Sequence, residues 1–319
     1  MPSIIKTVGT VMAGLAALGS AAPAAPKLTP AQMKIHNVMR RQNAAAAALG
    51  LTDIDILQFA LTLEHLESEF YRQGFAQFPP EQFTALGLTQ QEIDDLTNIG
   101  KTEEAHVVLL QGAIAQAGVQ PVQACQYNFG FTDALGMVGT AAVLENVGVS
   151  AYLGASTLVA DPGILTTAAT ILTVEARHQS FIRAASKIIA VPQAFDTPLS
   201  AKQVFSLAAP FIASCPEGSN LILTAFPTLT MAAGQDAAAL QAGATIQLQS
   251  DASAQATSCA FTTGGLPGGT AFSDFVNGAC TIPQGLSGIT YVNLASASPL
   301  NGVLTDDVIL AGPMVMQVS

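Results

Sequence analysis

Basic residues are scarce in this chain. It has 11 Lys and Arg against 22 Asp and Glu in 319 residues, with a formal net charge of −11. Proteins that bind nucleic acid neutralise its phosphates with clustered Lys and Arg, so nucleic acid is not expected as a partner. Charged residues of both signs make up only 10% of the chain and apolar residues 50%. This balance excludes a disordered chain and predicts a large buried core.

The first apolar run, residues 8–18, is shorter than the roughly 18 to 20 residues that span a bilayer. It follows Lys6 and precedes the small residues 19–21, a pattern typical of a secretory signal peptide. We therefore expect residues 1–21 to be removed and the protein to be extracellular or in the cell wall. An uncleaved membrane anchor is the alternative, which the shortness of the run disfavours.

Residues 22–50 are expected to form an N-terminal linker. Their dibasic pair Arg40-Arg41 lies between a Pro- and Ala-rich stretch and the first convincing helix. Secretory pathways often cut such pairs, so this segment is also a candidate propeptide. An uncleaved solvated turn is the simpler interpretation.

Cysteines with the close spacing of a structural zinc site, about two to four residues, are absent. The four cysteines all follow the expected signal peptide, and an even count in a secreted chain favours two disulfides. Three pairings are possible. We favour Cys259–Cys280, which would close a short loop, and Cys125–Cys215, which would tie the two halves of the chain together.

Residues 51–192 are predicted to form a four-helix bundle, because apolar residues recur there every three or four positions. Thr52 and Thr89 begin helix-capping patterns. The expected helices cover residues 52–74, 89–118, 132–158 and 164–190.

The third of these helices also has the length and composition of a membrane span, because residues 134–160 hold a single charged residue, Glu145. Its carboxylate lies at the centre of the helix, several glycines interrupt it, and neighbouring helices could cover every face. We therefore favour a buried helix of the bundle and expect no membrane span after signal cleavage.

The chain changes character after the fourth helix. Residues 193–216 are expected to be a connector with a short helix near 198–213, for which Ser200 is the candidate cap. Residues 217–319 are rich in Gly, Ser and Thr, and short strand-like segments alternate with turns, which predicts a β-sandwich-like domain. The strand-like segments are residues 245–249, 289–294 and 314–318.

Two of the four histidines follow a glutamate by three positions, in Glu103-x-x-His106 and Glu175-x-x-His178. Residues three apart lie on one face of a helix, so each pair can direct a carboxylate oxygen and an imidazole nitrogen at one point. Each pair is half of a metal site, and finding it twice by chance is improbable.

Glu64 in the first helix and Glu145 in the third complete the set. An unpaired carboxylate costs several kcal/mol to bury, and a cation bridged by carboxylates would compensate that cost. The helices then carry Glu, Glu-x-x-His, Glu and Glu-x-x-His, an internal two-fold repeat and the ligand order of dinuclear bundle sites. The candidate metal ligands are Glu64, Glu103, His106, Glu145, Glu175 and His178.

Two tyrosines repeat in the same way, since Tyr71 and Tyr152 each lie seven residues after a candidate ligand glutamate. Seven residues are two turns along one helix face, so both phenols are candidate catalytic groups. Two ordinary core tyrosines with satisfied hydroxyls are an equally simple interpretation.

Other side chains near the candidate ligands weigh less. Glu67, three residues after Glu64, is a reserve ligand. Glu69 and His65 are expected to point about 100° or more away from the Glu64 direction, and Glu104 is also expected to face away from the site.

The chain resembles the ferritin-like superfamily in four segments, which are residues 63–71 (LEHLESEFY), 103–106 (EEAH), 144–146 (LEN) and 175–178 (EARH). The likeness covers about residues 50–190 and is greatest to secreted ferritin-like proteins of fungi and to plant desiccation-related proteins. It implies that the four-helix bundle is ferritin-like. Together with the β-sandwich-like domain that the strand pattern predicts, this gives an α+β two-domain fold. The resemblance also implies two iron or two manganese ions that react with dioxygen or peroxide. Glu64 and Glu145 look like the single-carboxylate ligands, and the two Glu-x-x-His pairs like the bridging-carboxylate and imidazole ligands.

Our leading hypothesis is a secreted di-metal protein for redox chemistry in oxidative or desiccation stress, with catalase-like or metal-oxidase activity. The stress association comes from the resemblance alone. The alternative is a non-enzymatic secreted or cell-wall protein, in which a metal-free bundle is a scaffold and the C-terminal domain contacts wall polymer or another protein. Metal sequestration without turnover is a third option. Iron storage inside a shell of ferritin-like subunits is disfavoured, because the C-terminal β region could obstruct such a shell.

Overall fold

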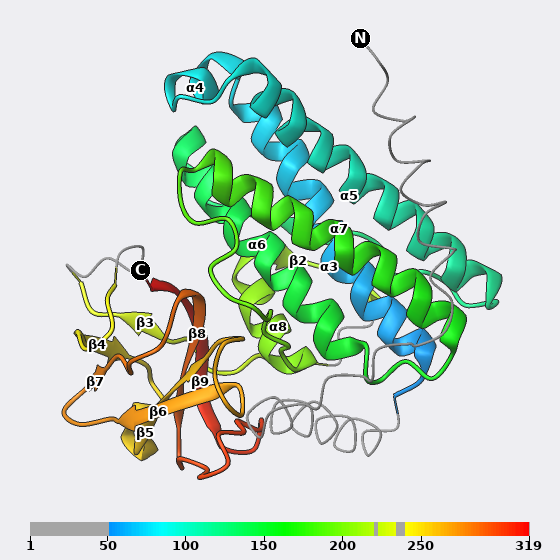
Figure 1. The fold of residues 1–319 in the computed structure, drawn as a ribbon. Helices are drawn as coiled ribbons and strands as arrows, with labels where there is room; N and C mark the ends of the chain where they lie inside the picture. Colours follow the sequence, from blue (N-terminus) through cyan, green and yellow to red (C-terminus); the bar gives the residue numbers. More distant parts are fainter. Residues whose placement is uncertain (1–50, 220–222, 234–239, 319) are drawn as a thin grey trace, which may run out of the picture.

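The computed structural model describes residues 51–219, 223–233 and 240–318, with a helical part followed by a β-rich part (Figure 1). The expected signal peptide and the dibasic pair Arg40-Arg41 lie outside these residues. The predicted α+β fold class with two domains is confirmed.

The helical part contains four long helices among the described residues: α3 (Asp53–Gln77), α5 (Gln90–Gln116), α6 (Ala134–Ala155) and α7 (Pro162–Ala185). A side-chain oxygen just before each helix accepts a hydrogen bond from a first-turn backbone N–H that has no partner within the helix. The capping residues are Thr52, Thr89, Asp133 and Asp161. The four predicted helices are confirmed, although the fourth ends at Ala185 rather than near residue 190.

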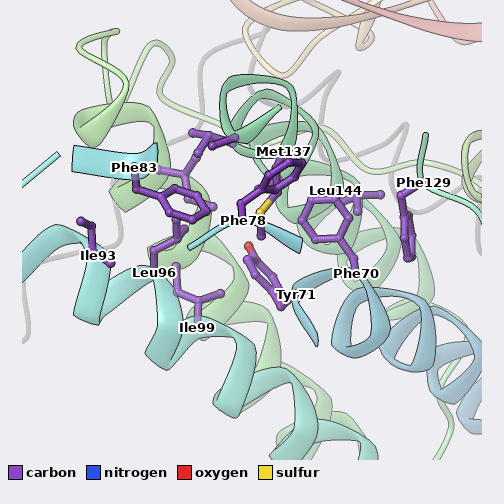
Figure 2. Packing of buried hydrophobic residues seen from close by; sticks show 14 of the residues in the cluster. Phe70, Tyr71, Phe78, Phe83, Ile93, Leu96, Ile99, Phe129, Met137 and Leu144 are labelled. Atoms are coloured by element: carbon purple, nitrogen blue, oxygen red, sulfur yellow. The ribbon is translucent and has the colours of Figure 1, made fainter. Parts of the chain in front are cut away.

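A short helix that sequence periodicity did not indicate, α4 (Pro80–Ala85), lies between α3 and α5. It places Phe83 in a cluster of buried aromatic and aliphatic side chains (Figure 2). Phe70 of α3, Leu96 of α5 and Met137 of α6 belong to the same cluster, and each is at most 2% exposed. Ile182 of α7 belongs to it as well, so this apolar core joins all four long helices at one end of the bundle.

Helix α6 has the length and composition of a membrane span, yet 61% of its most apolar window is buried inside the protein. It packs against α3, α7 and the short helix α8 (Ala201–Ala208). A helix enclosed by protein on several sides needs apolar residues on several faces. These contacts favour the buried bundle helix over the membrane span.

The connector runs from the bundle to the β-rich part. Ser200 caps α8 as predicted, and the chain continues through a 3₁₀ turn, η1 (Ala209–Phe211), into β2 (Ile212–Ser214). β2 pairs antiparallel with β1 (Gln126–Tyr127), which lies in the loop before α6. The disulfide Cys125–Cys215 lies beside this pair, as predicted. The domain boundary that we propose near residue 216 comes directly after it.

The described residues of the β-rich part form two antiparallel sheets. The larger has the strand order β6 (Thr270–Asp274), β5 (Ser258–Thr262), β8 (Gly288–Ala295) and β9 (Ile309–Val318). The smaller has the order β3 (Thr230–Met231), β4 (Thr245–Gln249) and β7 (Ala279–Thr281), and a 3₁₀ turn, η2 (Ser253–Gln255), follows β4. The three predicted strand segments therefore fall in β4, β8 and β9.

The two sheets share one apolar core. Ile246 and Leu248 alternate with exposed residues along β4 and belong to the same buried cluster as Phe261 of β5. The disulfide Cys259–Cys280 joins β5 to β7 within this core, so the second predicted pairing is also confirmed. Two packed sheets with inward apolar residues are the expected β-sandwich-like arrangement.

A strap of chain, residues 191–200, lies between the two parts. Near its start, the Gln193 side-chain amide donates to Thr263 Oγ1 and Ser287 O of the β-rich part. Near its end, the Leu199 N–H donates to Ser150 O of α6 at 3.1 Å. This close approach requires Gly154, because a Cβ built there would lie 1.8 Å from Leu199 O.

We expect Gly154→Ala to lower the free energy of unfolding by about 1 to 3 kcal/mol, a typical cost of overpacking. The added methyl group would meet the backbone of the strap, which cannot rotate away. Gly139→Ala is the matched control on the same helix, because a Cβ built at Gly139 has no neighbour within 4 Å. There the higher helix propensity of Ala should stabilise the protein slightly. Denaturant unfolding measures both, and equal stabilities would contradict the tight packing of the strap.

Candidate metal centre

All six candidate ligands lie in the interior of the bundle. The four glutamates are at most 1% exposed and the two histidines at most 8%. Each long helix contributes at least one of them, namely Glu64 from α3, Glu103 and His106 from α5, Glu145 from α6, and Glu175 and His178 from α7.

These side chains form two groups that could each hold a metal ion. In each group four donor atoms, one from each side chain, all lie within 4.8 Å of one another. The groups share Glu103 and Glu175, and each adds one further glutamate and one histidine. The first group is Glu64, Glu103, His106 and Glu175, and the second is Glu103, Glu145, Glu175 and His178.

Three carboxylates surround the Nδ1 atom of His106. It lies 3.2 Å from Glu64 Oε2, 3.0 Å from Glu103 Oε2 and 3.3 Å from Glu175 Oε1. A ring nitrogen carries at most one proton, so it cannot donate a well-directed hydrogen bond to all three. A nitrogen and three oxygens that converge in this way can all be satisfied together by a metal cation.

His178 repeats this arrangement in the second group. Its Nδ1 lies 2.8 Å from Glu103 Oε1 and 3.1 Å from Glu145 Oε2. Its Nε2 lies 3.0 Å from the hydroxyl of Thr102, which donates its own proton to Ile99 O at 2.7 Å. Thr102 can therefore accept from Nε2–H, which would leave Nδ1 to bind a metal ion when one is present.

Burial sets the pKa of these carboxyl groups. It raises the pKa of Glu64 to about 7 and shifts the pKa of Glu145 and Glu175 in the same direction, and neighbouring carboxylates add to each shift. Burial also acts to raise the pKa of Glu103, but hydrogen bonds from the two histidines outweigh it and lower this pKa to about 2.

The cluster holds more acidic than basic groups. Five of its glutamates are buried when Glu67 is included, and among the described residues the ion-pair partners of these carboxylates are His106 and His178. Among the described residues, neither Oε atom of Glu175 has a hydrogen-bond partner. Carboxylate oxygens with imidazole nitrogens are the donor set of iron and manganese sites in bundles, so these residues fit bound metal ions.

Gly148 makes room for the carboxylates on α6. A Cβ built there would lie 2.5 Å from Glu175 Oε2 and 3.1 Å from Glu67 Oε1. Sequence reasoning missed both Gly148 and Thr102. Two signals could have indicated them, because Gly148 follows Glu145 by three positions on the same helix face and Thr102 directly precedes a candidate ligand.

Comparison with known proteins agrees with this architecture. Residues 52–187, which include all six candidate ligands, match the family model of the ferritin-like domain. They form a ferritin-like domain. The chain is also similar to Protein rds1 of Schizosaccharomyces pombe, with 25% identity over 178 residues that cover 56% of this chain and 44% of that protein. The match therefore spans less than half of the length of this relative.

Two buried tyrosines of the ferritin-like domain contact the candidate ligands crosswise. Tyr71 of α3 donates to Glu145 Oε1 of α6, and Tyr152 of α6 donates to Glu64 Oε1 of α3 at 2.5 Å. Sequence spacing placed each tyrosine near the glutamate of its own helix. Because α3 and α6 run antiparallel, each phenol instead reaches the glutamate of the other helix. Burial, followed by the nearby carboxylates, raises the pKa of both phenols well above its ordinary value, so both remain donors.

Glu67 lies beside the two groups and is only 4% exposed. Burial, followed by the charges of Glu175 and Glu64, raises its pKa well above its ordinary value. His65 directs its Nε2 at a loop carbonyl 3.3 Å away, and Glu104 is exposed. Of the lower-ranked side chains, Glu67 is thus the one that the structure places at the cluster.

An apolar cavity of about 270 Å³ lies beside the cluster in the ferritin-like domain. Its wall comes from all four long helices and includes Leu57, Leu110, Ala151 and Ile164. Tyr152 also lines it, and the hydroxyl of this side chain reaches a candidate ligand. The side chain of Tyr152 therefore connects the wall of the cavity to the cluster.

We expect Glu67→Gln to stabilise the metal-free protein by about 1 to 3 kcal/mol at pH 7. A carboxyl group whose pKa is raised by folding destabilises the native state at this pH, because the unfolded chain leaves it ionised in water. Denaturant unfolding in the presence of a chelator measures the effect. Glu104→Gln, which changes an exposed neighbour of a ligand, should leave the stability unaltered. A destabilised Glu67→Gln protein would indicate that this carboxylate is favourably paired.

Proposed function

We propose that this ferritin-like domain binds a dinuclear iron or manganese centre and uses it for redox chemistry with peroxide or dioxygen. The observation that carries the proposal is the pair of four-ligand groups with two shared carboxylates. A shared carboxylate can bridge two ions, and bundles that bind two iron or manganese ions use this combination of Glu and Glu-x-x-His.

The ligands have two kinds of role in this proposal, bridging both ions or binding one of them. Glu103 and Glu175 would bridge the two ions. Glu64 with His106 would complete one coordination sphere, and the remaining glutamate and histidine would complete the other. When bound, two such ions supply electron exchange with an oxygen substrate, which the protein side chains cannot supply.

The chain's own residues would orient the ligands and limit which molecules reach the metal ions. The hydroxyls of Tyr71 and Tyr152 hold one oxygen of Glu145 and of Glu64, so the other carboxylate oxygens remain turned toward the histidines. These phenols could also supply a proton to a reacting oxygen atom, and the apolar cavity at Tyr152 favours entry of small uncharged molecules.

An extracellular or cell-wall location for this chemistry is part of the proposal. Two disulfides among the described residues support it, because disulfides persist in oxidising compartments. The expected signal peptide points the same way. A role in oxidative or desiccation stress rests on the resemblance to secreted fungal and plant desiccation-related proteins.

Elemental mass spectrometry of full-length protein purified without chelators should find about two iron or manganese ions per chain. Glu175→Ala should remove most of both ions, because this carboxylate belongs to both groups. His106→Ala should remove about one ion, since this imidazole belongs to a single group. Glu104→Ala on the same helix is the control and should retain the full content.

The same measurement can reject the proposal. A metal-free protein that also fails to take up added iron or manganese would favour the non-enzymatic scaffold. Two bound ions without any consumption of peroxide or dioxygen would favour sequestration.

Tyr152→Phe should leave the metal content unchanged and slow peroxide or dioxygen consumption by about ten- to hundredfold, the usual effect of losing an outer-shell hydrogen bond. The substitution removes only the hydroxyl that holds Glu64. An oxygen electrode measures the rate. Tyr127→Phe, whose hydroxyl accepts from the Cys125 N–H instead, is the matched control. An unchanged rate in Tyr152→Phe would make this residue an ordinary core tyrosine.

A further inference from the structure

One side chain of the β-rich part contacts α6 at the residue next to the candidate ligand Glu145. Tyr291 of β8 is fully buried. Its hydroxyl accepts from Asn146 Nδ2 at 2.6 Å and donates to Asn146 O at 3.2 Å, and Ser150 Oγ lies 2.9 Å from it. A phenol hydroxyl has one proton and two lone pairs, so these α6 groups can occupy all of its hydrogen-bonding positions.

The hydrogen-bond chain continues from α6 to α7. The Gln179 side-chain amide donates to Asn146 Oδ1 at 3.1 Å. Asn146 directly follows the ligand Glu145, and Gln179 directly follows the ligand His178. Glu145 and His178 are the two ligands that belong only to the second group. Each is therefore next in sequence to a residue of this hydrogen-bond series, and the series ends at Tyr291 of β8.

The first group is supported differently. The residue that follows Glu64 is His65, whose Nε2 lies 3.3 Å from Val122 O in the loop between α5 and α6. This contact stays within the ferritin-like domain. The two groups carry similar ligands. Among the hydrogen bonds of the described residues, only the second group is linked in this way to the β-rich part.

The surroundings of Tyr291 favour a rigid link. Its ring belongs to a buried apolar cluster with Val147 and Ala151 of α6, Leu199 of the strap and Ile289 of β8. Figure 1 shows α8 close to this region, and α8 packs against both α6 and β9. Hydrogen bonds shielded from water in this way restrain their partners more strongly than exposed ones do.

We propose that Tyr291 is a positioning residue for Glu145 and His178, so that the β-rich part completes one half of the dinuclear centre. This inference rests on the proposed function. By holding Asn146, the hydroxyl fixes the α6 backbone at the neighbouring ligand and, through Gln179, the α7 backbone at the other. Removing a side chain that hydrogen-bonds a metal ligand directly typically weakens metal binding by about 10- to 100-fold, and we expect an effect of this size from a restraint on the residues next to the ligands.

Metal titration of the full-length protein tests the proposal. The metal-free chain is titrated with manganese(II), bound ions are counted by equilibrium dialysis with elemental analysis, and electron paramagnetic resonance reports whether two ions are paired. Tyr291→Phe should weaken the binding of one manganese ion by about 10- to 100-fold, while the other ion binds as before. At low manganese concentration, the resonance signal of two neighbouring manganese ions should then be lost. Gln179→Met breaks the same chain from the bundle side and should give the same selective loss.

Tyr127→Phe is the matched control, because it also removes one tyrosine hydroxyl but lies at the connector. Both ions should bind to it as they do to the unmodified protein. Thermal unfolding of each metal-free variant shows whether the fold is intact. Equal weakening of both ions, or normal binding of both, in Tyr291→Phe and Gln179→Met would overturn the positioning role and leave the dinuclear proposal standing. An unmodified protein that binds no manganese or iron would overturn both.

Discussion

The burial of five glutamate side chains between four helices is the constraint on which the rest of the structure depends. Each ionised carboxylate is costly to remove from water, and the two histidines compensate only part of the negative charge. The raised pKa values of Glu67 and Glu175 reflect this cost. The surrounding bundle must supply the stability that the cluster lacks, and it does so with an aromatic core at one end and a disulfide at the connector (Figure 2).

The antiparallel arrangement of the helices gives the cluster its reciprocal contacts. Tyr71 reaches Glu145 while Tyr152 reaches Glu64, and each histidine contacts the glutamate of the opposite Glu-x-x-His pair. The two halves are thus nearly equivalent in their ligands. Their surroundings differ, because one half is supported by a loop of the bundle and the other by β8. A site that is symmetric in its ligands therefore has two distinct halves, and this gives the β-rich part a role in the bundle.

Local sequence rules predicted the four long helices, the short helix α8 and three of the strands. Helix caps, three- and four-residue periodicity and the Glu-x-x-His spacing depend only on neighbours within a few positions. They were therefore sufficient for the four long helices and the choice of candidate ligands, whose roles remain predictions. Alternation indicated β4, β8 and β9 in the same way, but the other strands of the described residues were missed. Helix α4 was missed because its six residues are too few for a periodic pattern.

The sequence by itself thus determined which long helices form and which of their faces carry carboxylates and imidazoles, because both follow from local backbone geometry. Only the tertiary structure decided that the tyrosines bond across to the opposite helix, that Glu67 is buried at the cluster, and that Gly148 and Gly154 leave room for neighbouring atoms. Tyr291 and Asn146 are separated by 145 positions and meet through the packing of two domains. Such contacts depend on which faces meet and at what register, and the packing of the whole chain sets both.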